Sequence, residues 1–322
     1  MPQILAENLV KEYRIPVRDK GLAGAVKALF APKYRTKVAV DHINFSIEKG
    51  EVVGYIGPNG AGKSTTLKML SGILYPSAGK LSVGGIVPYE NRRANAMQIG
   101  VVFGNRSQLY WDLPVIDSFE LNHRLYRIPD DMYKENVAYF SEIFDLTSIL
   151  NQPVRLLSLG QKMRATIAAA MLHSPDILFL DEPTIGLDVS SKLRIRDFIR
   201  EVNRTRGTTV ILTSHDMGDI ESLCSRIILI SEGHIKYDGG IAAFEDAFGG
   251  NYSIRFKTNA SPGALTGLGL KFRESVASYY TVLGNEKMLR LADAISQINA
   301  LGVEELEIKN QTLEEIIHAY FG

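Results

Sequence analysis

Several absences limit the classes of protein to which this sequence can belong. It has one cysteine, Cys224, which excludes an internal disulfide framework and is expected to be a buried thiol in a reducing compartment. No run approaches the roughly 20 apolar residues that span a bilayer, and the charged start of the chain argues against a secretory signal. The 36 basic residues balance 36 acidic ones, so no net field draws the protein to nucleic acid. A role at a membrane would therefore need a separate embedded partner.

The pattern of apolar residues predicts an α/β fold. Between residues 40 and about 237, β-branched runs alternate with helical patterns, as expected for a largely parallel sheet with helices between its strands. Shorter strand and helix patterns follow, and no chemical motif is visible among them. At 322 residues, the chain is long enough for one large core and an appended domain.

We expect a first domain over residues 1–240 and an accessory α+β domain over residues 241–322. Within the first, a helical subdomain is expected over about 105–170. The basic stretch 14–38, bounded by Gly and Pro, is predicted to be an insertion. Its apolar patch at 22–30 has the pattern of about two turns of amphipathic helix.

The stretch GPNGAGKST has the P-loop pattern, and it follows an apolar strand and opens a helix, as that motif requires. Glycines permit a tight loop whose amides surround phosphates. Lys63 places a positive charge at the terminal phosphates, and Ser64 offers a hydroxyl to Mg²⁺. The predicted nucleotide-binding residues are Gly57, Pro58, Asn59, Gly60, Ala61, Gly62, Lys63, Ser64 and Thr65.

Two further strand ends carry reactive side chains. The apolar run DILFLD ends in Asp181, which suits the Mg²⁺ shell, and Glu182 is then the best candidate to orient or deprotonate the attacking water. His215 follows the strand TTVILTS. Because the carboxyl ends of parallel strands share one edge, His215 is predicted to contact the γ-phosphate there.

Ser158 precedes an Ala-rich helical run and is predicted to be its N-cap. The amides at such a helix end attract anions. Nothing close to Ser158 in the chain completes an anion site, so the sequence alone leaves the identity of the anion open.

These motifs, in this order, resemble the ATP-binding subunit of ATP-binding cassette (ABC) transporters over about two thirds of the chain. GPNGAGKST resembles Walker A, ILFLDE resembles Walker B with Glu182 as its catalytic residue, and SH resembles the switch motif with His215. LSLGQ at 157–161 stands where the signature LSGGQ belongs, and GLD resembles the D-loop, which ends at Asp188.

The resemblance implies an ATPase that uses ATP and Mg²⁺ and has a P-loop core of mainly parallel strands with added antiparallel strands. It implies that two copies, or this chain and a closely related ATPase, close head to tail over the ATP sites. Ser158, Gly160 and Gln161 would then bind the γ-phosphate of ATP held by the second copy. Tyr13 would stack on adenine, although an ordinary strand aromatic is the alternative.

Within the family, the chain is most similar to ATPases of type-2 exporters, which hydrolyse ATP to ADP and phosphate and work with separately encoded integral membrane subunits. It would lie peripherally on the cytoplasmic face of the cell membrane and bind no nucleic acid. The flank that includes Tyr110 and Trp111 would receive a coupling helix from the membrane subunit. A core position for Trp111 is the alternative.

The sequence departs from the family pattern at two positions. Leu159 replaces the first glycine of the signature, which is tolerated with a negative φ and strained with a positive one. The family's Q-loop Gln is also displaced, so either Asn105 or Gln108 must supply the carbonyl ligand to Mg²⁺, and Asn105 is closer to the strand end.

Two other functions fit parts of the pattern. A soluble ABC ATPase of translation or DNA repair usually has two cassettes or a long coiled coil, and the sequence has one Walker A and no sustained heptads. A regulatory subunit with little turnover would require damaging departures, whereas Glu182 and His215 are both present. The transported substrate cannot be read from the sequence.

Overall fold

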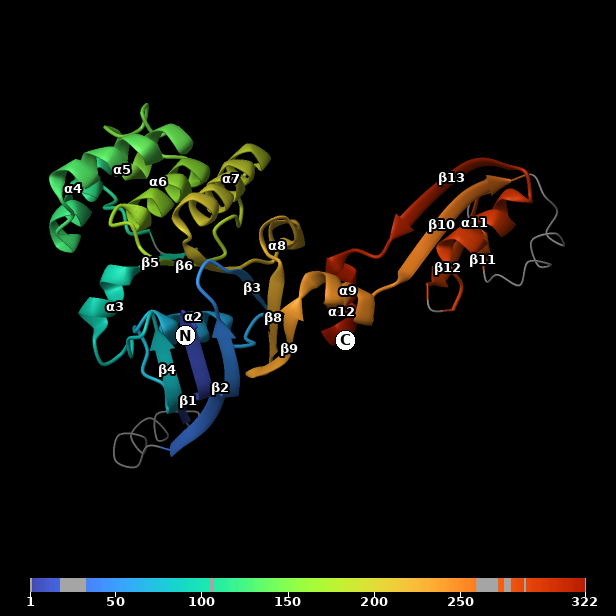
Figure 1. Cartoon of the computed structure of the whole chain (residues 1–322), viewed down its shortest axis with the longest axis horizontal. Coiled ribbons are helices and arrows are strands. Elements are labelled where there is room, and N and C mark those ends of the chain that lie inside the picture. Colours follow the sequence, from blue (N-terminus) through green and yellow to red (C-terminus); the bar gives the residue numbers. More distant parts are fainter. Residues whose placement is uncertain are drawn as a thin grey trace, which may run out of the picture. The chain divides into compact units, whose positions relative to one another are not determined.

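The computed structural model separates the chain into two compact units, residues 1–239 and 240–322, which are described individually. Figure 1 shows their elements. The helix expected at residues 22–30 lies outside the described residues. The structure describes residues 2–17, 33–104, 107–258, 272–274, 279–286 and 288–321.

The first unit contains a six-stranded sheet, in which all strands except the edge strand β9 are paired in parallel, as predicted. Each of these five parallel strands is almost entirely buried, which explains its continuous apolar sequence. The order across the sheet is β5 (Ile99–Phe103), β6 (Ile177–Asp181), β7 (Thr209–Thr213), β3 (Val52–Ile56), β8 (Arg226–Ser231) and β9 (His234–Gly240).

A second, antiparallel sheet has the order β2 (Lys33–Ile47), β1 (Ile4–Val17) and β4 (Ala78–Val83). Helix α2 (Lys63–Leu70) contributes buried residues to one core together with both sheets. The ends of the predicted insertion 14–38 are not separate from the fold, because they continue β1 and β2 as paired strands.

The other helices of the first unit lie mainly on the side away from the antiparallel sheet of β1, β2 and β4 (Figure 1). The helical subdomain expected over 105–170 contains α4, α5, a short 3-10 turn at Val154–Leu156, and α6. The helices are α3 (Arg92–Gln98), α4 (Val115–Tyr126), α5 (Asp130–Ile143), α6 (Leu159–Met171), α7 (Val189–Arg206) and α8 (Met217–Leu223).

The second unit is an α+β structure with its own small core. Its antiparallel sheet has the order β11 (Phe272–Glu274), β12 (Tyr279–Asn285), β10 (Asn251–Thr258) and β13 (Val303–Asn310). Alternate residues of β10 and β12 pack with helix α11 (Leu291–Asn299). Helices α9 (Ile241–Phe248) and α12 (Leu313–Phe321) contact each other.

Two expectations from composition can be compared with this structure. Cys224 is buried as predicted, and burial raises the pKa of its thiol to about 12. Among the described residues, no helix is both long and apolar enough to cross a membrane.

Candidate ATP site

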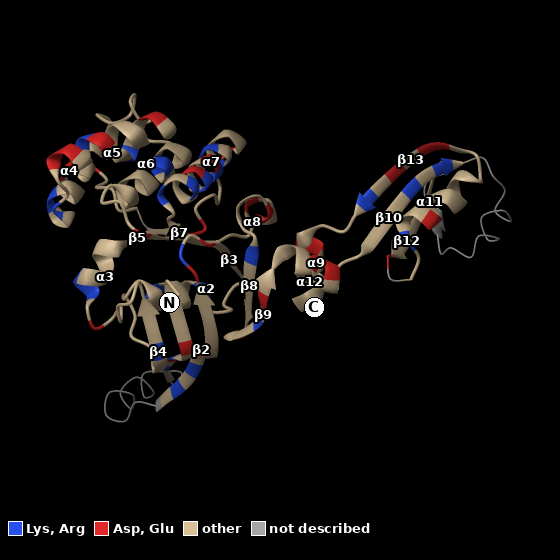
Figure 2. Cartoon of the chain, in the orientation of Figure 1, with Lys and Arg blue, Asp and Glu red and all other residues tan. Residues whose placement is uncertain are grey.

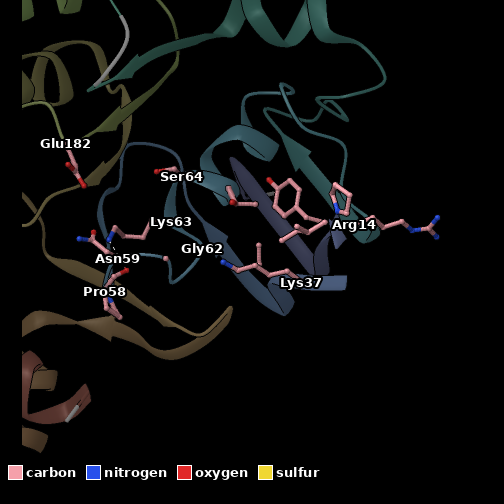
Figure 3. Close-up of a pocket in the computed structure, with 14 residues that line it drawn as sticks. Arg14, Lys37, Pro58, Asn59, Gly62, Lys63, Ser64 and Glu182 are labelled. Carbon is pink, nitrogen blue, oxygen red and sulfur yellow. Dashed lines mark hydrogen bonds between the residues drawn. The ribbon is translucent and has the colours of Figure 1, made fainter. Parts of the chain in front are cut away.

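A cavity of about 530 Å³ lies beside the glycine-rich loop that joins β3 to α2. Figure 3 shows the loop in the middle, with Glu182 on one side and the strand residues Arg14 and Lys37 on the other. The residues that line the cavity are Tyr13, Arg14, Ile15, Pro16, Lys37, Ala39, Pro58, Asn59, Gly60, Gly62, Lys63, Ser64, Thr65 and Glu182.

The loop fits between neighbouring strands only because glycines form it. A Cβ on Gly57 would lie 2.0 Å from the carbonyl oxygen of Ile230, and one on Gly62 would lie 2.6 Å from that of Ala39. Gly62 also has a φ of 117°, which strains any residue with a side chain. Gly62 is the N-cap of α2, and no side chain caps that helix, so its first amides are available to phosphate.

Lys63 is buried at the base of this loop. Its Nζ donates to the carbonyl oxygens of Gly57 and Pro58. Burial lowers the pKa of the Lys63 ammonium, while the negative charges of Glu182 and Asp181 oppose that shift. A buried ammonium whose hydrogen-bond partners are neutral carbonyls gains strongly from anionic phosphate oxygens.

Asp181 connects the loop with two strand ends. Ser64 Oγ donates to one carboxylate oxygen of Asp181 at 3.0 Å, and Thr213 Oγ1 donates to the other at 2.7 Å. Hydroxyl and carboxylate oxygens are suitable ligands for Mg²⁺. The described residues contain no group of three or more His, Cys, Asp or Glu able to hold a metal. Ser64 and Asp181 therefore fit an ion that takes its other ligands from phosphate and water.

Glu182 contacts His215 at the edge of the sheet where the parallel strands end. Glu182 Oε1 lies 3.0 Å from His215 Nε2. The backbone of Glu182 has a φ of 55°, an unfavourable conformation for a residue with a side chain. Its N–H donates to both the carbonyl and the hydroxyl oxygen of Thr213, each at 3.1 Å, and these bonds hold the carboxylate at the cavity.

Sequence reasoning missed several residues of this site. Thr213 forms hydrogen bonds with both acidic residues of the Walker B motif. In the sequence, a hydroxyl residue at the end of an apolar strand could have indicated this role. Arg14 and Lys37 line the cavity but fell within the predicted insertion. Tyr13 also lines the cavity, partly buried on β1 and paired with Lys37, so its role at adenine stays a prediction.

Ser158 is the N-cap of α6, which confirms that prediction. Its Oγ accepts from the Gln161 N–H at 3.2 Å, and its own N–H donates to Gln161 Oε1 at 2.9 Å, forming a capping box. Leu159 is the first helical residue, is 52% exposed and is not among the residues with positive φ. Leucine is therefore unstrained in place of the usual glycine.

Gly160 packs closely against the helix that follows the D-loop of the same chain. A Cβ at Gly160 would lie 2.3 Å from Ser191 Oγ and 3.4 Å from the carboxylate of Asp188. Asp188 is the N-cap of α7 and accepts from Ser191 Oγ at 2.7 Å and from its N–H at 2.9 Å. These hydrogen bonds lower the pKa of Asp188. The first turns of α6 and α7 thus pack together, and among the described residues no hydrogen bond or ion pair joins Ser158, Gly160 or Asp188 to the chain's own P-loop.

Gly160→Ala is expected to destabilise the monomer by about 1–3 kcal/mol, the usual cost of overpacking. The added methyl group would push Ser191 Oγ away from Asp188. In the Ser191→Ala background the obstructing Oγ is absent, so adding Gly160→Ala there should cost much less than it does in the wild-type chain. Urea unfolding measures both changes, and a Gly160→Ala variant of wild-type stability would contradict the close contact.

The Q-loop assignment stays a prediction. Asn105 lies outside the described residues. The Gln108 amide donates to the carbonyl of Val101, back along β5, and Gln108 is not among the residues lining the cavity. Gly104 N–H donates to the Asp181 carbonyl at 2.8 Å, so the chain leaves β5 beside Asp181. Trp111 is 58% exposed, so the alternative of a core tryptophan is wrong.

Comparison with known proteins points to one family. A family model described as ABC transporter matches residues 40–185. The ABC transporter ATP-binding protein NatA of Bacillus subtilis is 34% identical over 218 residues, which cover 68% of this chain and 88% of NatA. The linearmycin resistance ATP-binding protein LnrL of the same organism is 33% identical over 277 residues, covering 86% of this chain and 81% of LnrL.

Solved structures are similar in fold. The structure of cbiO1 from Clostridium perfringens, part of the ABC transporter complex cbiONQ, has a TM-score of 0.61 and 26% identity, covering 76% of this chain and 92% of cbiO1. The dimeric cassette MJ0796, in a post-hydrolysis state with ADP and phosphate, has a TM-score of 0.61 and 24% identity over 74% of this chain and 98% of its own.

Proposed function

The chain belongs to the ATP-binding subunits of ABC transporters, a family of ATPases, and on this premise we propose that it powers an exporter of the type-2 group. Two similar proteins support the direction of transport. LnrL is named for linearmycin resistance, and YbhF of Escherichia coli, 36% identical over 209 residues, is named a probable multidrug transporter protein. ATP binding would close the dimer, and hydrolysis would reopen it.

The contact between Glu182 and His215 beside the P-loop cavity is the observation that carries the proposed hydrolysis. ATP would lie with adenine against Tyr13 and its phosphates on the loop amides and Lys63. Glu182 would orient the attacking water and accept its proton, and His215 would fix the Glu182 carboxylate and contact the γ-phosphate. Ser158, Gly160 and Gln161 of a second copy would bind that phosphate from the other side.

We assign Mg²⁺ to Ser64 and Asp181, with Asn105 favoured over Gln108 as the amide ligand. Bound there, the ion would neutralise charge on the β- and γ-phosphates. The carboxylate of Asp181 accepts hydrogen bonds from Ser64 and Thr213 and is thereby held beside the P-loop. Thr213 also fixes the Glu182 backbone, so one hydroxyl orients both acids.

The proposed partner is an integral membrane subunit encoded separately, with this chain bound peripherally at the cytoplasmic face. Tyr110 and Trp111 are both exposed in the helical subdomain. The Lys162 ammonium, near the start of α6, lies 4.5 Å from the centre of the Trp111 ring, a cation–π distance. Exposed aromatic residues of this kind are typical anchors of protein interfaces.

Extraction of native membranes in mild detergent should recover this chain with an integral membrane protein. Trp111→Ala is expected to reduce recovery about tenfold or more, because anchor residues contribute at least that much to affinity. Ile73→Ala, at a residue with similar exposure, is the matched control and should retain the complex. Recovery of the wild-type chain without any membrane subunit would contradict the proposal.

A further inference from the structure

A fully buried carboxylate lies behind the catalytic loops. Asp219, on α8, has no exposed surface, and its carboxylate accepts three hydrogen bonds and forms an ion pair. Its Oδ2 accepts from Thr184 Oγ1 and from Ser214 Oγ, the latter at 3.0 Å. Its Oδ1 accepts from Arg196 Nε at 2.6 Å, and Arg196 Nη2 lies 2.5 Å from the same oxygen as an ion pair. Both oxygens of the carboxylate therefore have partners.

The donors come from the loops that carry the proposed catalytic groups. Thr184 is two residues after Glu182, and Ser214 immediately precedes His215. Arg196 belongs to α7, the helix that begins at the D-loop. One carboxylate thus links the ends of β6 and β7 to α7 and α8.

We propose that Asp219 is a positioning residue for ATP hydrolysis. Through Thr184, Ser214 and Arg196, it holds the loops that carry Glu182 and His215 in fixed positions relative to each other. The inference rests on the proposed function of Glu182. Asp219 itself would touch neither ATP nor the attacking water.

The surrounding charges make the buried anion stable. Figure 2 shows basic residues along α7 and acidic residues on α8. Lys192 on α7 pairs with Asp216 at 2.6 Å, and Arg196 Nη2 lies 3.7 Å from Asp216. The hydrogen bond from Lys192 lowers the pKa of Asp216. Arg196 therefore provides the direct counter-charge to Asp219, while Lys192 neutralises the second acid.

This arrangement would affect the rate of hydrolysis more than ATP binding. Asp219, Thr184 and Ser214 are absent from the residues lining the P-loop cavity, while Thr184 and Ser214 line a neighbouring cavity of about 250 Å³ with Glu182 and His215. Their loss should therefore leave the P-loop contacts to nucleotide in place. A displacement of about 1 Å at the reacting groups costs roughly 100-fold in rate. A change in kcat with a constant KM for ATP therefore distinguishes positioning from nucleotide binding.

The test compares two isosteric changes at buried threonines of the full chain. Thr184→Val removes one hydrogen bond to the Asp219 carboxylate and should lower kcat about tenfold, because a shift of the Glu182 loop by part of 1 Å costs part of the roughly 100-fold loss expected for a full 1 Å. The KM for ATP should change less than about twofold. Thr209→Val is the control. It removes a hydroxyl that accepts from Gly50 N–H at the opposite end of β7, and it should leave kcat unchanged. Wild-type kcat in Thr184→Val would overturn the proposal.

A second comparison uses the Glu182→Gln/His215→Ala background, which lacks both residues that Asp219 is proposed to position. If Asp219 acts through these two residues, adding Thr184→Val to that background should lower the residual turnover no further. An additional tenfold loss would overturn the proposal. Full turnover in Glu182→Gln alone would instead refute the proposed role of Glu182, so the two failures are distinguishable. Asp219→Asn should lower kcat by roughly 100-fold if it folds, and Thr184→Val decides the matter if it does not.

Discussion

Glu182→Gln is expected to lower ATP turnover by about 100- to 10,000-fold while ATP binding persists. That is the usual contribution of a general base, and the substitution removes the negative charge while keeping the size of the side chain. The backbone bonds from Glu182 to Thr213 are unaffected, so the unusual φ of 55° is retained. The variant should accumulate as an ATP-bound closed dimer, because the step that reopens it is blocked.

Steady-state phosphate release and size-exclusion chromatography with ATP measure these two effects. Glu232→Gln is the matched control, because Glu232 also ends a parallel strand and also has a positive φ, of 49°, but does not line the cavity. That control should hydrolyse ATP at the wild-type rate. Undiminished hydrolysis in Glu182→Gln would remove Glu182 from the mechanism.

Ser158→Asp is expected to abolish dimer closure and to reduce hydrolysis by about 100-fold or more, with ATP binding by the monomer nearly unchanged. Aspartate caps a helix as well as serine does, so α6 should keep its N-terminus. The added charge would face the γ-phosphate of the second copy, and two like charges about 4 Å apart repel by roughly 4 kcal/mol near a protein surface.

Ser158→Asn separates charge from shape, because asparagine is also a good N-cap and has nearly the same size as aspartate. The Asn variant should retain much more activity than the Asp variant. Nucleotide affinity of each monomer, measured by fluorescence titration, should be similar in both. Equal activity of the Asp and Asn variants would argue against a phosphate at this helix end.

Local sequence patterns were sufficient for most of the first unit. The buried parallel strands have continuous apolar sequences, and the loop from Gly57 to Thr65 has little conformational alternative because its glycines approach neighbouring backbone. Ser158 was predicted as an N-cap because capping depends on neighbouring residues alone. The Walker B acids were found because their strand ends are explicit in the sequence.

Long-range contacts could not be predicted in this way. Arg14 pairs with Thr36, so the ends of the predicted insertion form two strands. The sequence did not indicate these strands, because basic residues on exposed strands give no alternation of apolar and polar residues. Gly160 was interpreted as a phosphate contact, whereas its packing against Ser191 depends on a helix about 30 residues away. Asp219 gave no signal, since nothing in its local sequence indicates burial among Thr184, Ser214 and Arg196.

The shared ATP site is tested most directly by sedimentation of the Glu182→Gln chain with ATP and Mg²⁺. The proposed arrangement predicts a dimer in Glu182→Gln and a monomer in Glu182→Gln/Ser158→Asp, each with ATP bound. A dimer that persists in the Ser158→Asp double variant, or a Glu182→Gln chain that remains monomeric with ATP bound, would contradict a site completed by the signature of a second copy.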